Sequence, residues 1–218
     1  LWLVTMTQQY NGNATGAYFL SNSGNPMFVP TRGTVDLFDQ SKDYRFNFYF
    51  GDRTVSMTEA TATISAFTKY PGNPSLYTSI NNFKNMGKPF RIAEQYLIAA
   101  EASAEAGYPS KANKYLNDLK AKRMNGYTSE QQSGEVLLNN IREERQRELL
   151  GEGFRLGDLK RWKQGFRRSE GQNNAIINTL GNVSRMEYES DDYRFLWPIP
   201  KAEIDANPQI KNPPNPGY

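Results

Sequence analysis

The chain has 218 residues, of which 38% are hydrophobic and 13% aromatic, so we expect one sizeable domain, or two small ones, with an aromatic-rich core. It contains no Cys and no His, which excludes disulfides, thiol nucleophiles, Ser-His-Asp arrangements and imidazole-bound zinc. The formal net charge of +3 is mild and gives no reason to expect nucleic-acid binding.

The amino-terminal segment, 1–89, is predicted to consist of loops and short strands. LWLVTMT at 1–7 favours a strand by its β-branched and aromatic content. YRFNFYF at 44–50 alternates aromatic residues with other side chains on the opposite face, which predicts a half-buried strand. We expect Gly51 and Asp52 to form a two-residue hairpin turn, after which RTVSMT returns antiparallel.

Residues 90–165 are predicted to form a helical repeat region. RIAEQYLIAAEASAEAG predicts a helix that ends at Gly107, and Ser110 is expected to cap a second helix. The second helix carries an apolar stripe at i, i+3, i+4 and i+7, formed by Ala112, Tyr115, Leu116 and Leu119. The two helices together span about one tetratricopeptide-type repeat of roughly 34 residues. A third helix is expected at about 134–150, with Leu137, Leu138, Ile141 and Leu149 facing inward.

Residues 166–218 are predicted to be a loop followed by an extended tail. Pro recurs every few residues in FLWPIPKAEIDANPQIKNPPNPGY, which excludes a long helix but allows a short turn at KAEIDAN. We expect Trp197, Ile199 and Tyr218 to hold this tail on the surface.

The charged stretch EERQRELLGEGFRLGDLKRW at 143–162 has two interpretations. Glu144, Glu148 and Glu152 recur at one-turn spacing, so a helix would present carboxylates on one face, as a glycosidase with two carboxyls roughly 5 to 9.5 Å apart requires. Each carboxylate has a basic neighbour at helical spacing, however, in the pairs Glu143 with Arg147, Arg145 with Glu148, and Arg155 with Asp158. A neighbouring guanidinium lowers the pKa of a carboxyl group, whereas a general acid needs a raised pKa. The pattern therefore favours an ion-pair network that braces stacked helices.

A basic run follows, formed by Lys160, Arg161, Lys163, Arg167 and Arg168. Binding of single-stranded nucleic acid would need a broad positive surface with aromatic partners. The chain offers one cluster, which we interpret as a solvated helix end. Trp162 and Trp197 could stack on a ligand, but their apolar or Pro-bounded surroundings favour core or tail-anchoring positions.

Five segments in a specific order resemble the SusD/RagB family: RIAEQYLIAAEASAEAG, ANKYLNDLKAKR, IREERQRELLGEGFRLGDLKRW, WPIPKAEIDANPQI and the terminal NPGY. Upstream, FVPTRGTVDLFDQSKDYRFNF resembles the family's segment that leads to its Asp-x-Arg hairpin, matched here by Asp43 and Arg45. The resemblance implies that the charged motif defines the fold and does not contact ligand. Its matched positions are Ile141, Glu144, Arg145, Glu148, Leu149, Glu152, Gly153, Arg155, Asp158 and Leu159.

The resemblance implies a mainly α fold of tetratricopeptide-like helix pairs with long loops and a small β-hairpin region, in which residues 1–218 are the C-terminal part of a SusD-like domain. It also implies an outer-membrane lipoprotein of Bacteroidetes-type bacteria, facing the cell exterior. Such a protein captures oligosaccharide or polysaccharide and delivers it to a SusC-like TonB-dependent transporter without catalysis. Family members are usually about twice as long and begin with a lipidated cysteine after a signal peptide. LWLVTMTQQY has neither feature, so we expect a fragment whose lipid anchor and amino-terminal half lie outside this chain.

Loops in the first 80 residues supply candidate glycan contacts, because aromatic rings lie beside amides there. Aromatic faces can pack against sugar rings while polar groups bond the hydroxyls. The candidates are Tyr10, Asn11, Asn13, Tyr18, Phe19, Asn22, Tyr70, Asn73 and Tyr77. For each ring, packing onto the helical body is the alternative.

Three function classes stay open at this point: a glycan-binding import component, a glycoside hydrolase with paired carboxylates, and a structural or adhesion protein of the cell surface without a glycan ligand. We expect no cofactor and no metal site. Asp36, Asp39 and Asp43 are clustered, so calcium binding stays open as an alternative, although they do not match the spacing of an EF-hand loop.

Overall fold

The computed structural model describes residues 15–21, 23–58, 60–77, 83, 85, 87–173, 175–176, 187–210 and 217. Several predictions fall outside these residues: the strand at 1–7, the anchoring residue Tyr218, and the candidate glycan contacts Tyr10, Asn11, Asn13 and Asn22.

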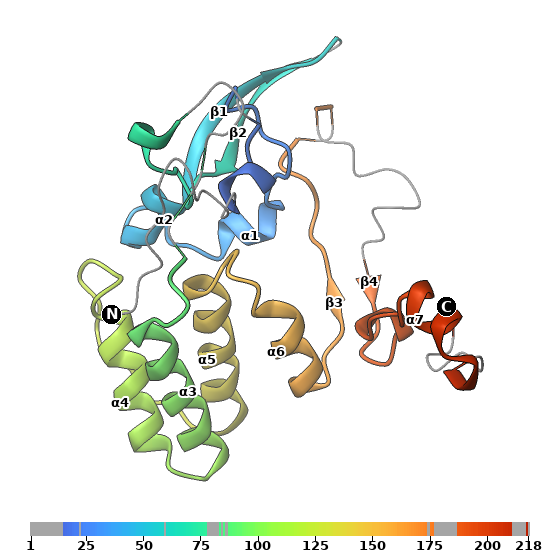
Figure 1. Cartoon of the computed structure of the whole chain (residues 1–218). Helices are drawn as coiled ribbons and strands as arrows, with labels where there is room; N and C mark the ends of the chain where they lie inside the picture. The colour runs from blue at the N-terminus through green and yellow to red at the C-terminus, as the bar shows by residue number, and fades with distance from the viewer. Residues whose placement is uncertain are drawn as a thin grey trace.

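A body of four helices forms the larger part of the fold, as Figure 1 shows. The helices are α3 (Ile92–Glu105), α4 (Pro109–Lys120), α5 (Gly134–Glu148) and α6 (Arg155–Trp162). α3 lies side by side with both α4 and α5. The small residues Ala93 and Ala100 are buried in these contacts, so neighbouring helices can approach closely. The prediction of a mainly helical fold with a tetratricopeptide-like helix pair and a small β-hairpin is confirmed.

Apolar stripes bury the inner faces of these helices. Ala112 and Leu116 of α4 pack with Ala100, Leu137 and Ile141 in one cluster. A second cluster contains Ala93, Leu97, Leu119 and Leu149. Tyr115 and Leu138 are half-buried at the margins. Ser110 does not cap α4, because the helix begins one residue earlier at Pro109, a residue whose fixed φ and missing N–H suit the first helical position.

Residues 44–49 form a helix, α2 (Tyr44–Tyr49), so the predicted strand is wrong. The carboxylate of Asp43 caps this helix by accepting the backbone N–H of Arg45 at 2.9 Å. Arg45 and Tyr49 are buried four residues apart, which is helical spacing, while Phe48 is exposed. The aromatic alternation is therefore not a burial pattern here, because it is Arg45 that turns inward.

The hairpin consists of β1 (Phe50–Ser56) and β2 (Thr61–Phe67), which places Gly51 and Asp52 within β1 and not in the predicted turn. The strands pair antiparallel with Phe50 opposite Phe67, and Met57 N donates to Ala60 O at 2.7 Å beyond the last pair. At its base the hairpin packs in a cluster with α1 (Arg32–Asp36) and α2, formed by Val35, Phe38, Tyr49, Phe50 and Phe67. Its tip projects away from the molecule (Figure 1).

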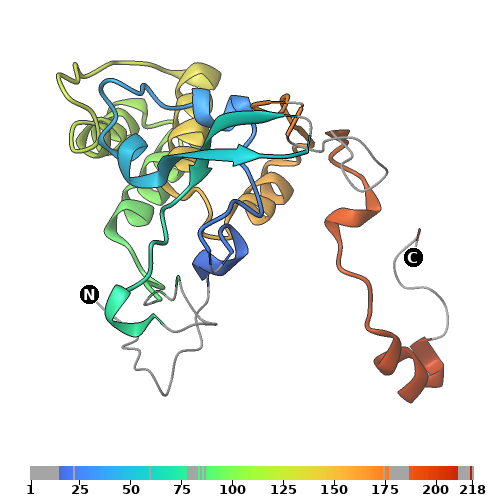
Figure 2. The same cartoon turned by 90° about the horizontal axis from the view of Figure 1, so that it is seen from above.

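The last described part of the chain lies apart from the helical body, as Figure 2 shows. It contacts the preceding segment through the short pairing of β3 (Phe166–Arg167) with β4 (Glu187–Tyr188), where the rings of Phe166 and Tyr188 stack 5.0 Å apart. The ring of Phe166 also contacts that of Phe195, 6.3 Å away between ring centres. The KAEIDAN segment forms α7 (Lys201–Ala206). Trp197 is 80% exposed, so a core position for it is wrong, whereas Ile199 is half-buried. None of the described helices is long and apolar enough to cross a membrane.

Candidate functional site

Glu148, the last residue of α5, is the centre of a buried ion-pair network. Its carboxylate is fully buried and binds three guanidinium groups. Arg45 Nη1 lies 2.9 Å from Oε2, Arg91 Nη1 lies 3.0 Å from Oε1, and Arg123 contacts both oxygens at 2.8 and 3.0 Å. Burial by itself would raise the pKa of Glu148, but hydrogen bonds and charge from Arg123, together with the charges of Arg45 and Arg91, lower it to about 2.

Arg45 connects this carboxylate to two others. Its Nε and Nη2 donate to the two oxygens of Asp43 at 2.9 and 2.8 Å, and its Nη1 donates to Glu144 Oε1 at 2.7 Å. Glu144 also accepts from Arg147 Nε at 2.9 Å. Asp43 and Arg45 therefore fix α2 on α5, across about a hundred residues of sequence, and the Asp-x-Arg motif starts a helix and not a hairpin.

Glu152 joins the network from the turn that follows α5. The helix ends before Glu152, yet its carboxylate still binds Lys69 Nζ at 2.5 Å and Arg91 Nε at 3.0 Å. Lys69 Nζ also donates to the carbonyl of Leu150 at 2.9 Å and lies 4.2 Å from the ring centre of Tyr49. Burial lowers the pKa of Lys69 to about 8, although Glu152 opposes this shift.

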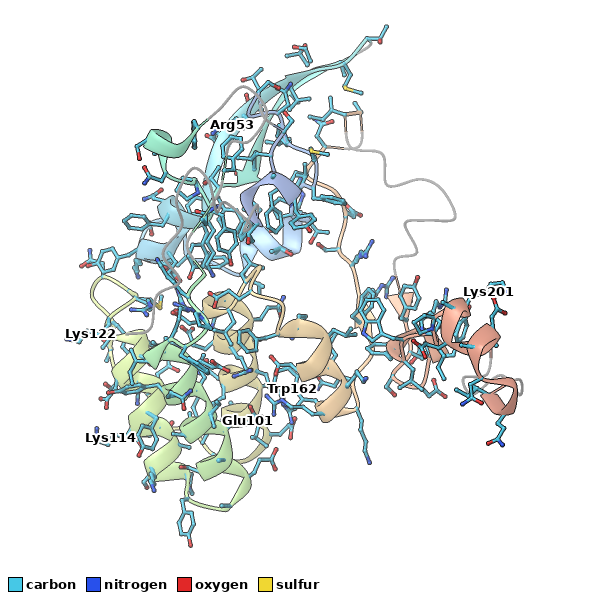
Figure 3. All side chains as sticks on the ribbon, in the orientation of Figure 1. Arg53, Glu101, Lys114, Lys122, Trp162 and Lys201 are labelled. Carbon is cyan, nitrogen blue, oxygen red and sulfur yellow. The ribbon has the colours of Figure 1, made fainter. Side chains whose placement is uncertain are left out.

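A second group of charges links α3, α5 and α6. Arg145 Nε donates to Asp158 Oδ2 at 2.7 Å, and Arg161 Nε donates to the other oxygen at 3.0 Å. Arg161 also binds Glu101, whose Oε1 accepts the indole N–H of Trp162 at 2.6 Å. Figure 3 shows Glu101 and Trp162 close together, whereas Lys114 lies on the outer side of α4 and Lys122 just beyond the end of that helix. Burial by itself would raise the pKa of Glu101. The hydrogen bonds from Arg161 and Trp162 have the larger combined effect, so the pKa of Glu101 is lowered.

The charged motif thus makes only some of the pairs that local spacing suggests. Arg145 binds Asp158 rather than Glu148, while Glu143 and Arg147 do approach to 3.7 Å. The guanidinium of Arg155 lies 5.9 Å from the ring centre of Trp162. Glu144 and Glu148 share a helix face, but every described oxygen of both carboxylates accepts from arginine. Because its pKa is lowered to about 2, Glu148 is ionised at neutral pH and cannot serve there as a general acid.

The candidate glycan contacts within the described residues lie in two loops, 15–20 and 68–77, which we name the aromatic loops. Tyr18 is 69% exposed, whereas its neighbour Phe19 packs edge-on against Phe67 with ring centres 4.5 Å apart. Tyr70 stacks on Phe19 at 6.2 Å, and its hydroxyl donates to the carbonyl of Gly151 at 3.1 Å. The structure therefore brings these two loops together, with Tyr18 outward and Phe19 inward.

Asn73 and Tyr77 lie further along the second aromatic loop, around the short 3₁₀ helix η2 (Pro74–Leu76). Asn73 Oδ1 caps η2 by accepting the backbone N–H and hydroxyl of Ser75 at 3.1 and 2.8 Å. The hydroxyl of Tyr77 donates to the carbonyl of Pro71, and its ring contacts Phe83 at 5.8 Å. Tyr77 is still 36% exposed.

Sequence reasoning missed the residues that hold this region in place. Asn85 Oδ1 accepts from Gly72 N at 2.9 Å, and its Nδ2 donates to the carbonyls of Phe83 and Tyr70. Lys69, Arg91 and Arg123 were missed in the charge network because their partners lie far away in sequence. The signal that could have found Lys69 and Arg91 is a cationic residue next to an aromatic one, in TKY and FRI.

The three clustered aspartates are not arranged as a metal site. Both oxygens of Asp43 bind Arg45, and Asp39 Oδ1 accepts from Ser41 and Lys42. The described part of the chain holds no group of three acidic side chains that could bind a metal ion together. The absence of a cofactor stays a prediction.

Comparison with known proteins gives a family match. The model of the SusD family matches residues 51–218. A SusD-like protein from Formosa agariphila is 30% identical over 131 residues, which are 56% of this chain and 22% of the relative. The solved SusD superfamily protein from Bacteroides thetaiotaomicron VPI-5482 is 28% identical with a TM-score of 0.75, over 99% of this chain and 48% of that one. A candidate sugar-binding protein from Bacteroides vulgatus ATCC 8482 is 32% identical with a TM-score of 0.64, over 86% of this chain and 39% of that one. The chain therefore spans less than half the length of each of these three proteins.

Proposed function

Because the chain belongs to the SusD family, we propose that it is part of a cell-surface protein that binds a glycan and delivers it to a SusC-like TonB-dependent transporter in the outer membrane. The family match over 51–218 carries this proposal, and the similarity to a candidate sugar-binding protein supports it. The ligand is an oligosaccharide or polysaccharide, captured outside the cell.

The aromatic loops supply the chemistry that glycan binding requires. Sugar rings present apolar faces of C–H groups, which pack against aromatic rings, and hydroxyls, which need polar partners. Tyr18 and Tyr77 offer exposed rings. Tyr18 precedes Phe19, which packs on Phe67, and the ring of Tyr77 contacts Phe83. Because these contacts are already formed, ligand binding would not have to order the loops first.

Catalysis is not part of the proposal. A glycosidase would need one carboxyl group with a raised pKa and access to the scissile bond. Glu144 and Glu148 are fully buried, and the pKa of Glu148 is lowered to about 2. We therefore assign the charged motif to the scaffold and the ligand contacts to the loops.

Binding can be tested by affinity electrophoresis of the intact protein in gels that contain starch, xylan, pectin or alginate. Tyr18→Ala and Tyr77→Ala are expected to reduce the retardation of the wild type in whichever gel retards it. Tyr108→Ala is the matched control. Tyr108 is 64% exposed but lies in the connection between α3 and α4, which Figure 1 shows at the opposite end of the helical body from the hairpin. Equal retardation of wild type and both loop variants would remove these two residues from the site.

Two further measurements separate the rival functions. A reducing-end assay on the same polysaccharides should detect no product, whereas sustained release would favour the hydrolase. Absence of retardation across a broad glycan array, together with co-purification of a transporter, would favour a surface protein without a glycan ligand. Delivery itself requires that the tagged protein co-purify with a TonB-dependent transporter from detergent-solubilised outer membranes.

A further inference from the structure

The turn that follows α5, residues 149–153, makes direct contact with the aromatic loops. Three successive residues of this turn bind two successive residues of the second loop. The carbonyl of Leu150 and the carboxylate of Glu152 accept from Lys69 Nζ at 2.9 and 2.5 Å, and the carbonyl of Gly151 accepts from Tyr70 Oη at 3.1 Å. The end of the charged motif is therefore bonded to the start of the loop.

Gly151 is fitted against an aromatic ring. Its φ of +74° is in the left-handed region, and a Cβ at this position would lie 2.7 Å from the ring of Phe67. Phe67 in turn contacts Phe19 at 4.5 Å and Tyr70 at 6.0 Å between ring centres. Any side chain at residue 151 must displace Phe67, and with it the supports of both loops.

The contacts continue to the loop that carries Tyr18. Gly16 N donates to the carbonyl of Phe83 at 3.2 Å, and a Cβ on Gly16 would lie 2.4 Å from the carbonyl oxygen of Tyr70. The loop that carries Tyr18 is thus closely packed on the loop that carries Tyr70. On its other side, the turn is fixed by Arg91, whose Nε binds Glu152 at 3.0 Å.

We infer that the 149–153 turn is a positioning element for ligand binding: it sets the geometry of the aromatic loops through Gly151, Glu152 and Tyr70, without touching the glycan itself. This inference rests on the proposed function, because it assigns a role in presenting Tyr18 and Tyr77 to a ligand. It connects the family's charged motif, whose other members brace helices, to the ligand-contacting surface.

Two variants test the inference, each with a matched control. Gly151→Ala introduces the clash with Phe67, while Gly107→Ala alters a glycine after α3 that also has positive φ, +78°, but has no neighbour within 4 Å of a Cβ. Tyr70→Phe removes the hydroxyl bonded to Gly151 and keeps the ring. Tyr49→Phe removes a similar bond, 3.2 Å to the carbonyl of Glu148 in the same motif, from a residue on α2 outside the loops.

Two readouts are needed on the intact protein: amide hydrogen exchange of the aromatic loops, 15–20 and 68–77, and retardation in gels of starch, xylan, pectin or alginate. We expect Gly151→Ala and Tyr70→Phe to accelerate exchange in both loops by about tenfold and to weaken retardation several-fold. Gly107→Ala and Tyr49→Phe should leave both readouts within about twofold of the wild type, even where they lower the melting temperature as much as the two test variants do. If Gly151→Ala does not fold, Tyr70→Phe decides.

Several outcomes would overturn the inference. Unchanged exchange in Tyr70→Phe, with or without lost retardation, would mean that the turn does not hold the loops, and lost retardation alone would assign Tyr70 to direct contact. Equal effects in the control variants would mean that the turn contributes to the stability of the whole protein and has no specific role in positioning the loops. If the wild type is retarded by none of the four polysaccharides, the proposed function fails on that panel, whereas the exchange measurement still decides whether the turn positions the loops.

Discussion

The buried charge network and the aromatic loops use polar chemistry in opposite ways. Around Glu148, carboxylates and guanidinium groups are withdrawn from water and bound to one another, so they are saturated before any ligand arrives. In the loops, Tyr18 and Tyr77 keep exposed rings, and hydrogen bonds serve to fix the backbone around them. The difference teaches that a dense cluster of acids and bases in a sequence need not be a reactive centre. Charges that neutralise each other in the interior specify which segments meet, and the surface that remains can bind ligand.

The largest expected effect is from removing the central charge of the network. Glu148→Gln leaves Arg45, Arg91 and Arg123 without their shared buried partner, so we expect the free energy of unfolding to fall by about 3–5 kcal/mol. Glu143→Gln on the same helix is the control. Its side chain is 60% exposed, and the change should stay within about 0.5 kcal/mol. Urea unfolding measures both, and similar values for the two variants would contradict a special role for the buried cluster.

Acid titration tests the same carboxylate without changing its shape. The pKa of Glu148 is lowered from an ordinary value of 4.5 to about 2 in the folded protein. Its contribution to stability is therefore complete above about pH 4.5 and is lost as the pH falls toward about 2, a decrease on the order of 3 kcal/mol. Urea midpoints measured through this window should fall steeply in the wild type and less steeply in Glu148→Gln. Parallel slopes would mean that other carboxylates dominate acid unfolding.

Within the loops, two adjacent aromatic residues should separate binding from folding. Phe19→Ala removes a ring packed on Phe67 and Tyr70, and we expect a loss of about 2–3 kcal/mol of stability. Tyr18→Ala removes a ring that is 69% exposed, so stability should change by less than about 0.5 kcal/mol while retardation by polysaccharide falls. A destabilised Tyr18→Ala variant would place its ring in the scaffold instead.

The smallest effect is expected at an exposed ion pair. Lys114 and Asp118 approach to 2.6 Å on the outer face of α4, with side chains that are 70% and 43% exposed. Lys114→Ala should alter the free energy of unfolding by less than about 0.5 kcal/mol, and added salt should abolish the difference. A larger loss of free energy of unfolding that salt does not remove would contradict the distinction between surface ion pairs and the buried network.

The sequence was sufficient to predict the elements whose signals are local. The helix from Ile92 ends two residues before the predicted Gly107, and the stripe in α4 buries Ala112, Leu116 and Leu119 as its spacing predicts. The aromatic alternation at 44–50 led to a wrong prediction of a strand. The conformation there depends on Arg45, whose partners Glu144 and Glu148 lie about a hundred positions away in the sequence. A local pattern cannot report a contact of that separation, and the same limit hid Lys69, Arg91 and Arg123.

For the candidate site, composition pointed to the loops but could not separate exposed from packed rings. Tyr18 and Phe19 are adjacent and similar in sequence context, and only the position of Phe67 and Gly151 determines which ring faces inward. The hairpin register likewise differs from the prediction: Phe50 pairs with Phe67 at the base of the cluster, so the strands extend to Ser56 and Thr61 and place Gly51 and Asp52 within β1. These outcomes depend on packing between distant segments.

The convergence of three arginines on one carboxylate has a consequence for how the molecule comes apart. Arg45 lies on α2, Arg91 directly before α3, and Arg123 shortly after α4. Separating any of these segments from α5 therefore removes a positive charge from the buried carboxylate of Glu148. Such segments cannot fray independently, and the helical body together with α2 should open as a single cooperative unit, visible as uniform, slow amide exchange governed by global unfolding.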